Sequence, residues 1–486
     1  MKEVSKKEFA VNAFWKILEQ FSSKGISMLV SIVLARILLP SDYGILALTT
    51  VFTSLSDILI DGGFSTALIR KEKIDDLDYS AVFAVSSTIS LFLYLVLYFV
   101  APFLAQYYRE EKLVLILRII GITFFVQSFS AVQNGIVNRN MQFKLLFVCN
   151  TTASIISGII GVFAAYQGLG VWSLVLQRII QQFIYTAMIL IKVRWKISWK
   201  FDFKRIKEML SFSTGVVSAS LLNYFGGNLY SIAIGKKYSV TDLGYYDKGN
   251  QLPMQFSLYT FGAMSNVLLP TISSCKGDIE RVKQIIRKVV GMTSFLIMPL
   301  MVGLAVTSKE ILVLLFTEKW LSSLPIMWFA CLYYIATPYM LINIQVFFAF
   351  GKSKLRVKTE LIRLGLMAFG LGLFGFVFNC TMNQLAFVSA VIAVLVAFVT
   401  YFEIRKLINY KIAELVADVW KAILSSGIMG TIIILLEFII EFKNNIVSLV
   451  AKMLIGIIIY SGLVFILKMP EINDIICLLK RKNNNE

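Results

Sequence analysis

The sequence has 486 residues, of which 58% are hydrophobic and 16% are charged, and its formal net charge is +18. Soluble proteins keep about a quarter of their residues charged, so this composition excludes an ordinary soluble protein and indicates one that spans a membrane. The chain has no histidine, and its five cysteines form no C-x-x-C pair, so we expect no metal site, no cofactor and no disulfide framework.

Apolar stretches of membrane-spanning length follow one another along the whole chain. An α-helix rises 1.5 Å per residue, so about 20 apolar residues cross the hydrocarbon core of a bilayer. Fourteen stretches approach this length, at residues 14–37, 44–66, 80–106, 113–135, 145–166, 170–191, 210–234, 252–273, 289–307, 324–350, 359–378, 383–404, 416–440 and 446–467. The predicted fold class is therefore an all-α polytopic membrane protein with about 14 transmembrane helices.

The basic residues indicate how these helices are oriented. Most Lys and Arg residues outside the apolar stretches fall in alternate loops, and the richest of these loops is 192–207. Cytoplasmic loops carry an excess of basic residues, so both termini are predicted to be cytoplasmic. The net charge of +18 is then explained by membrane topology, and we expect no nucleic acid partner.

A weak internal repeat divides the chain. Residues 34–36 align with 234–236 and, without a gap, 41–44 align with 241–244, at the end of the first span of each half. An offset of six spans predicts a parallel pseudo-repeat. We therefore predict three parts: an N-lobe of six helices at 1–200, a C-lobe of six at 201–408, and two extra helices with a cytoplasmic tail at 409–486.

Polar residues inside the spans indicate where a binding site would lie. Each ionisable group at the bilayer centre costs about 2.5–3.5 kcal/mol, so such groups are retained when they are paired or face water. The candidates at helical spacing are Lys16, Glu19, Gln20, Ser23 and Lys24 in the first span, Asp57 and Asp61 in the second, and Arg178, Gln181 and Gln182 in the sixth.

Two interpretations of these charges stay open. In the first they form structural ion pairs, for example Lys24 with Asp57 or Asp61. In the second the cations Lys24 and Arg178 bind an anionic substrate, since arginine offers a forked donor that suits phosphate and lysine offers a point charge.

Other charged residues near the ends of the spans distinguish less well between structural pairing and substrate binding. Arg118 and Arg363 either extend to the membrane interface or act as further substrate ligands. Glu360, one turn before Arg363, is most simply its helical partner. We expect Glu437 and Lys452, in the last two spans, to be peripheral or to pair with each other.

No catalytic motif stands out. The sequence contains no Gly-rich phosphate loop, no H-E-x-x-H and no G-x-S-x-G motif, and no segment between spans is long enough for a nucleotide-binding domain. We therefore expect a protein that is not an enzyme. Energy for transport would come from an ion gradient, the membrane potential or the substrate gradient.

Four segments resemble a known family. They are residues 34–47 (LARILLPSDYGILA), 61–69 (beginning DGGFS), 170–175 (GVWSLV) and the spaced residues Pro270, Asp278 and Arg281. They are similar to blocks of the Wzx-type lipid-linked oligosaccharide flippases, which belong to the multidrug/oligosaccharidyl-lipid/polysaccharide exporter superfamily. The resemblance covers the first 290 residues well and the remainder by the number of spans.

The resemblance implies a V-shaped cavity between two six-helix bundles that opens alternately to each side of the bacterial inner membrane. The cargo would be an oligosaccharide linked to undecaprenyl pyrophosphate, flipped to the outer leaflet for surface polysaccharide biosynthesis. With membrane lipids around it, such a cavity would bind the pyrophosphate through the cations and amides of its lining. The predicted substrate ligands are Lys24, Arg178, Gln20, Gln181, Arg118 and Arg363.

A coupling ion would need carboxylates, and Asp57, Asp61 or Glu19 could bind a proton or a sodium ion. Two other functions stay open: an ion-coupled multidrug antiporter of the same superfamily and a membrane glycan polymerase. Cationic drugs would favour an anionic cavity, and a polymerase would need an acid or base in a large outer loop.

Overall fold

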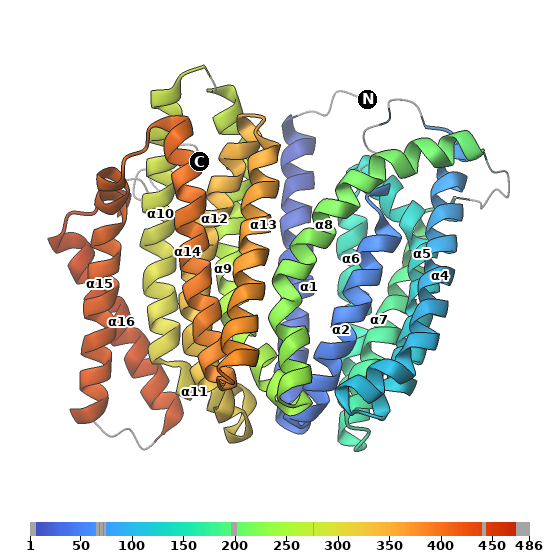
Figure 1. Cartoon of the computed structure of the whole chain (residues 1–486), viewed down its shortest axis with the longest axis horizontal. Helices are drawn as coiled ribbons and strands as arrows, with labels where there is room; N and C mark the ends of the chain where they lie inside the picture. The colour runs from blue at the N-terminus through green and yellow to red at the C-terminus, as the bar shows by residue number, and fades with distance from the viewer. Residues whose placement is uncertain are drawn as a thin grey trace. The chain divides into compact units, whose positions relative to one another are not determined.

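The structure is a computed structural model, and it describes residues 6–64, 68, 71, 74–195, 202–275, 277–439 and 444–472. Within these residues every regular element is a helix (Figure 1). Twelve of the described helices are long and apolar enough to cross a membrane. The prediction of an all-α polytopic membrane protein is confirmed.

The helices follow the predicted spans closely. In the first half they are α1 (Lys6–Ile37), α2 (Pro40–Asp61), α4 (Asp76–Tyr108), α5 (Lys112–Arg139), α6 (Phe143–Tyr166), α7 (Val171–Lys192) and α8 (Phe203–Lys237). They continue with α9 (Val240–Ser274), α10 (Ile279–Val306), α11 (Ser308–Phe316), η1 (Glu318–Ser323), α12 (Leu324–Ala349), α13 (Ser353–Gly370), η2 (Leu371–Val377), α14 (Met382–Ile408), α15 (Ile412–Ile439) and α16 (Asn445–Ile466). Each predicted span coincides with one helix over most of its length, with 359–378 on α13 and η2 together.

One helix end differs clearly from the prediction. The second span was expected to continue to residue 66, but α2 ends at Asp61. Gly62 and Gly63 follow it with φ angles of 51° and 70°. Glycine adopts this left-handed conformation without a steric penalty and commonly ends a helix in this way. Asp61 is therefore the last residue of its helix and not a mid-span residue.

The chain divides into two compact units, residues 1–244 and 245–486. In the first unit α8 packs against α2 and α4 and runs obliquely across them (Figure 1). The boundary predicted near residue 200 falls at 196–201, outside the described residues, and the three predicted parts stay a prediction.

Each unit has its own apolar interior and a large apolar exterior. In the first unit Phe64, Leu68 and Val132 belong to a buried cluster, and in the second unit Ile286 and Phe347 belong to another. Outside these clusters many large apolar side chains are exposed, as on α15 and α16. A bilayer explains this exposure, because lipid tails solvate apolar side chains as well as a protein interior does.

Candidate substrate site

Two of the predicted site residues form an ion pair in the first unit. Arg178 of α7 faces Asp57 of α2, with 3.6 Å between Nη2 of the arginine and Oδ2 of the aspartate. The two side chains are 34% and 42% exposed, so neither is enclosed within the unit. The side chain of Gln127 on α5 lies beside Asp57. Three helices therefore meet at this carboxylate.

The polar stripe of α1 forms a second group. Lys16 Nζ lies 3.1 Å from Glu19 Oε2, and Asn150 of α6 donates from Nδ2 to Glu19 Oε1 at 2.9 Å. Gln20 and Lys24, farther along the same stripe, have exposed side chains. Glu19 is thus held by two partners, while Gln20 and Lys24 are accessible.

The amides of α7 are joined to neighbouring hydroxyl groups. Gln181 donates from Nε2 to Ser154 Oγ of α6 at 3.2 Å, and Gln182 donates to Thr186 Oγ1, one turn along α7, at the same distance. The contact with Ser154 joins α7 to α6, and Arg178, three residues before Gln181, lies on the same side of α7. Their joint role as substrate ligands stays a prediction.

The charges of the predicted site residues in these two groups balance. Lys16, Lys24 and Arg178 are basic, and Glu19, Asp57 and Asp61 are acidic. The structural pairing that the sequence suggested for Asp57 exists, but its partner is Arg178 in place of Lys24. Asp61 has an exposed side chain and makes no ion pair with any described residue. An anion that binds to Arg178 must therefore compete with Asp57.

Arg118 lies apart from this group. Its guanidinium carbon is 4.0 Å from the centre of the Tyr98 ring, and Nε donates to the Tyr98 carbonyl oxygen at 3.4 Å. Nine residues, about 14 Å of helix rise, separate it from Gln127 on α5. Stacking on an aromatic ring fits the interfacial alternative for Arg118 better than substrate binding. Its role as a ligand stays a prediction.

Arg363 lies in the second unit with the partner that the sequence predicted. Nε of Arg363 donates to Glu360 Oε1 at 3.0 Å, and Arg356 Nη1 lies 2.7 Å from the other carboxylate oxygen. The side chains of Arg363 and Glu360 are mostly buried. Two arginines thus share one carboxylate on α13.

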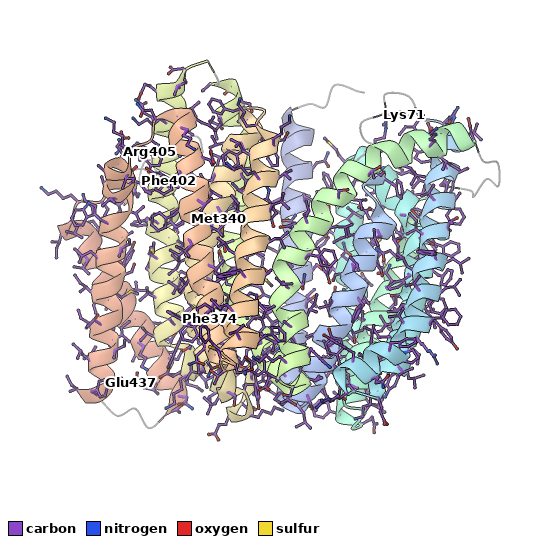
Figure 2. All side chains as sticks on the ribbon, viewed as in Figure 1. Lys71, Met340, Phe374, Phe402, Arg405 and Glu437 are labelled. Carbon is purple, nitrogen blue, oxygen red and sulfur yellow. The ribbon has the colours of Figure 1, made fainter. Side chains whose placement is uncertain are left out.

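The last two helices carry a further charged cluster. Lys452 of α16 lies 2.9 Å from Glu437 of α15, a residue labelled in Figure 2, as the pairing prediction required. Lys452 also contacts the buried Glu310 of α11, which accepts a hydrogen bond from Ser448. Glu310 was not among the predicted residues, because it lies in a short helix far from α15 and α16 along the chain.

The second unit also contains an apolar cavity of about 310 Å³ between α10, α12, α14 and α15. Val290, Ala397 and Trp420 are among the residues that line it. Its tyrosine hydroxyls already have partners: Tyr339 bonds to a serine hydroxyl, and Tyr401 donates to a backbone carbonyl. These apolar walls suit a hydrocarbon and not a phosphate group.

Among the described residues, no three His, Cys, Asp or Glu side chains come together as a metal site.

Comparison with known proteins gives the family. A family of polysaccharide biosynthesis proteins matches residues 33–325, which is more than half of the chain. The chain belongs to this family.

Relatives of this polysaccharide biosynthesis protein agree with the assignment. The teichuronic acid biosynthesis protein TuaB of Bacillus subtilis (strain 168) is 23% identical over 84% of each chain. The succinoglycan biosynthesis transport protein ExoT of Rhizobium meliloti (strain 1021) is 23% identical over 67% of this chain and 66% of its own. The lipopolysaccharide biosynthesis protein WzxC of Escherichia coli (strain K12) is 18% identical over 66% of this chain and 65% of its own. The family resemblance drawn from the motifs is confirmed.

Solved structures share the fold. The lipid II flippase MurJ in an inward closed conformation matches with a TM-score of 0.74 at 18% identity, over 94% of this chain and 98% of its own. An inward-facing multidrug resistance MATE family transporter of the MOP superfamily matches with a TM-score of 0.63 at 14% identity, over 81% of this chain and 98% of its own. This polysaccharide biosynthesis protein is thus a multi-pass membrane protein with the fold of that superfamily.

Two polar residues of the site were not predicted. Gln127 and Asn150 each lie inside an otherwise apolar span, at 113–135 and 145–166. An uncharged amide costs less in hydrocarbon than a charge, so it stands out less than Asp57 or Arg178. A search for every amide within a span would have found both.

Proposed function

We propose that this protein moves an oligosaccharide linked to undecaprenyl pyrophosphate from the inner to the outer leaflet of the bacterial cytoplasmic membrane by alternating access. The product would supply surface polysaccharide biosynthesis, and both termini would be cytoplasmic. Family membership and the names of the transport relatives support this proposal. A proton or sodium ion bound at Asp57, Asp61 or Glu19 would couple transport to an ion gradient.

The observation that carries the proposal is the position and hydrogen bonding of Arg178. It lies inside a membrane-spanning helix, 3.6 Å from a carboxylate, and donates no hydrogen bond to any described residue. An arginine retained at this depth without hydrogen bonds is costly unless it faces water or a ligand. Its planar fork of N–H donors matches the oxygens of a pyrophosphate. Gln181, on the same side of α7, would bind a sugar hydroxyl or phosphate oxygen.

The test is transport in reconstituted vesicles. A fluorescent oligosaccharide on a polyprenyl pyrophosphate is placed in one leaflet, and its arrival in the other is measured with a glycosidase that cannot cross the bilayer. We expect Arg178→Ala to lower the rate at least tenfold. Arg405→Ala is the matched control, because Arg405 is exposed at the end of α14 and makes no ion pair with a described residue.

Three results would contradict the proposal. Full activity of Arg178→Ala would remove this residue from the substrate site. A folded wild-type protein that transports cationic drugs and not lipid-linked glycans would establish the antiporter, and glycan lengthening by the purified protein would establish the polymerase.

A further inference from the structure

The contact between Arg178 and Asp57 is an ion pair without a hydrogen bond. A separation of 3.6 Å is beyond the usual 2.7–3.2 Å range for an N–H···O bond. Both side chains are about one-third to two-fifths exposed, and such pairs are weak. Asp57 is therefore close enough to Arg178 to reduce its attraction for another anion. The ion pair is also weak enough for a second anion to replace Asp57.

We propose that Asp57 makes Arg178 selective for a lipid pyrophosphate over the single-charge phosphodiester of an ordinary membrane phospholipid. This inference rests on the proposed function and adds the means by which the site rejects bulk lipid. Phospholipids surround the protein in large excess, so an arginine open to their headgroups would be occupied by them.

The selectivity follows from charge. A phosphodiester and the Asp57 carboxylate each carry one negative charge, so exchanging one for the other gains little and leaves Asp57 unpaired. A pyrophosphate diester carries two negative charges and offers more acceptor oxygens. Coulomb attraction scales with charge, and a bidentate contact adds hydrogen bonds that the 3.6 Å pair lacks. Exchange is therefore favourable only for the pyrophosphate.

The neighbours of Asp57 support this role. The side chain of Gln127 lies beside the carboxylate and offers it an amide N–H when the guanidinium moves away. Asp61, four residues farther along α2, adds a second negative charge on the same side of the helix. A weakly attracted anion meets repulsion from both carboxylates, and only a strongly attracted one overcomes it. Asp57 is therefore a positioning and specificity residue.

The experiment compares binding of two lipids to the full-length protein in lipid nanodiscs. The probes are a polyprenyl-pyrophosphate disaccharide and phosphatidylglycerol, and the measured quantity is the ratio of their dissociation constants. The isosteric variant Asp57→Asn removes the competing charge. We expect it to bind phosphatidylglycerol about fivefold more tightly, the effect of one partly exposed ion pair, and so to lower the pyrophosphate preference.

Two further variants show that the effect passes through Arg178. Asp57→Asn combined with Arg178→Gln should lose the gained affinity for phosphatidylglycerol, as a coupled pair requires. Asp76→Asn removes one exposed carboxylate at the start of α4 and should leave the ratio unchanged.

The outcomes separate the two proposals. A folded Asp57→Asn protein with the wild-type ratio would overturn this inference and leave the proposed function standing. A wild-type protein that does not prefer the pyrophosphate lipid would overturn both.

Discussion

Gly44 and Gly244 contact each other's helices in a reciprocal arrangement. A Cβ atom placed on Gly44 would lie 1.7 Å from the carbonyl oxygen of Val240, and one placed on Gly244 would lie 2.0 Å from that of Pro40. Pro40 and Val240 are the first residues of α2 and α9, so each glycine is the fifth residue of its helix. The positions that the repeat aligns thus face each other through equivalent backbone atoms. The repeat itself stays a prediction.

The contact predicts that a single methyl group is not tolerated there. Gly44→Ala should lower the free energy of unfolding by about 1–3 kcal/mol or more, because backbone atoms must move to make room for the new carbon atom. Thermal unfolding of the purified protein in detergent measures the change. Gly427→Ala in α15 is the control, since nothing lies within 4 Å of its added Cβ. An unfolding midpoint of Gly44→Ala at or above that of the wild type would contradict the prediction.

The buried cluster of Lys452 and Glu310 predicts a non-additive pair of substitutions. Burial raises the pKa of Glu310, but hydrogen bonds from Lys452 and Ser448 outweigh it and hold the pKa below its ordinary value. Glu310 is therefore ionised, and Lys452→Met should cost about 3–5 kcal/mol by leaving a buried charge. Combining Lys452→Met with Glu310→Met should restore most of that stability, because an apolar pair of similar volume needs no desolvation.

Thermal unfolding in detergent again measures this effect. Lys358→Met is the control, because Lys358 pairs with Glu403 from a position that is 57% exposed and should matter little. If the double variant were as unstable as Lys452→Met alone, the cluster would hold α16 by packing and not by charge.

The start of α8 is attached to the start of α4 by a pH-sensitive contact. The Arg205 side chain hydrogen-bonds Asp75, and its Nη1 lies 3.3 Å from Asp78 Oδ1. This bond holds the pKa of Asp75 below its ordinary value. A depressed carboxyl pKa stabilises the folded state above the unfolded pKa of about 3.9, and that stability is lost as the pH falls through the folded pKa.

Hydrogen exchange can test this attachment. Backbone amides of residues 203–210 should exchange faster at pH 3 than at pH 7, after correction for the intrinsic rates. Arg205→Gln should show the fast exchange already at pH 7 and a smaller pH effect. Equal protection of the wild-type segment at both pH values would rule out the ion pair as its main attachment.

The short-range features of the site could be predicted from the sequence. Arg363 and Glu360 are three residues apart on one helix, so their pairing follows from helical geometry. Lys452 and Glu437 lie on consecutive spans, and their pairing was one of two alternatives that the sequence left open. The partner of Asp57 could not be found in this way. The sequence suggested Lys24, but Arg178 occupies the position, on a helix far along the chain.

The sequence by itself determined that this protein spans a membrane many times, where its apolar spans lie, and to which family it belongs. Those properties depend on the length of apolar runs and on local motifs, which need no knowledge of neighbouring helices. Only the tertiary structure decided which intramembrane charges meet, and that two glycines bring α2 and α9 into backbone contact. The rotation of each helix about its axis is set by packing against segments distant in sequence, so a polar stripe predicts a face but not the side chain opposite it.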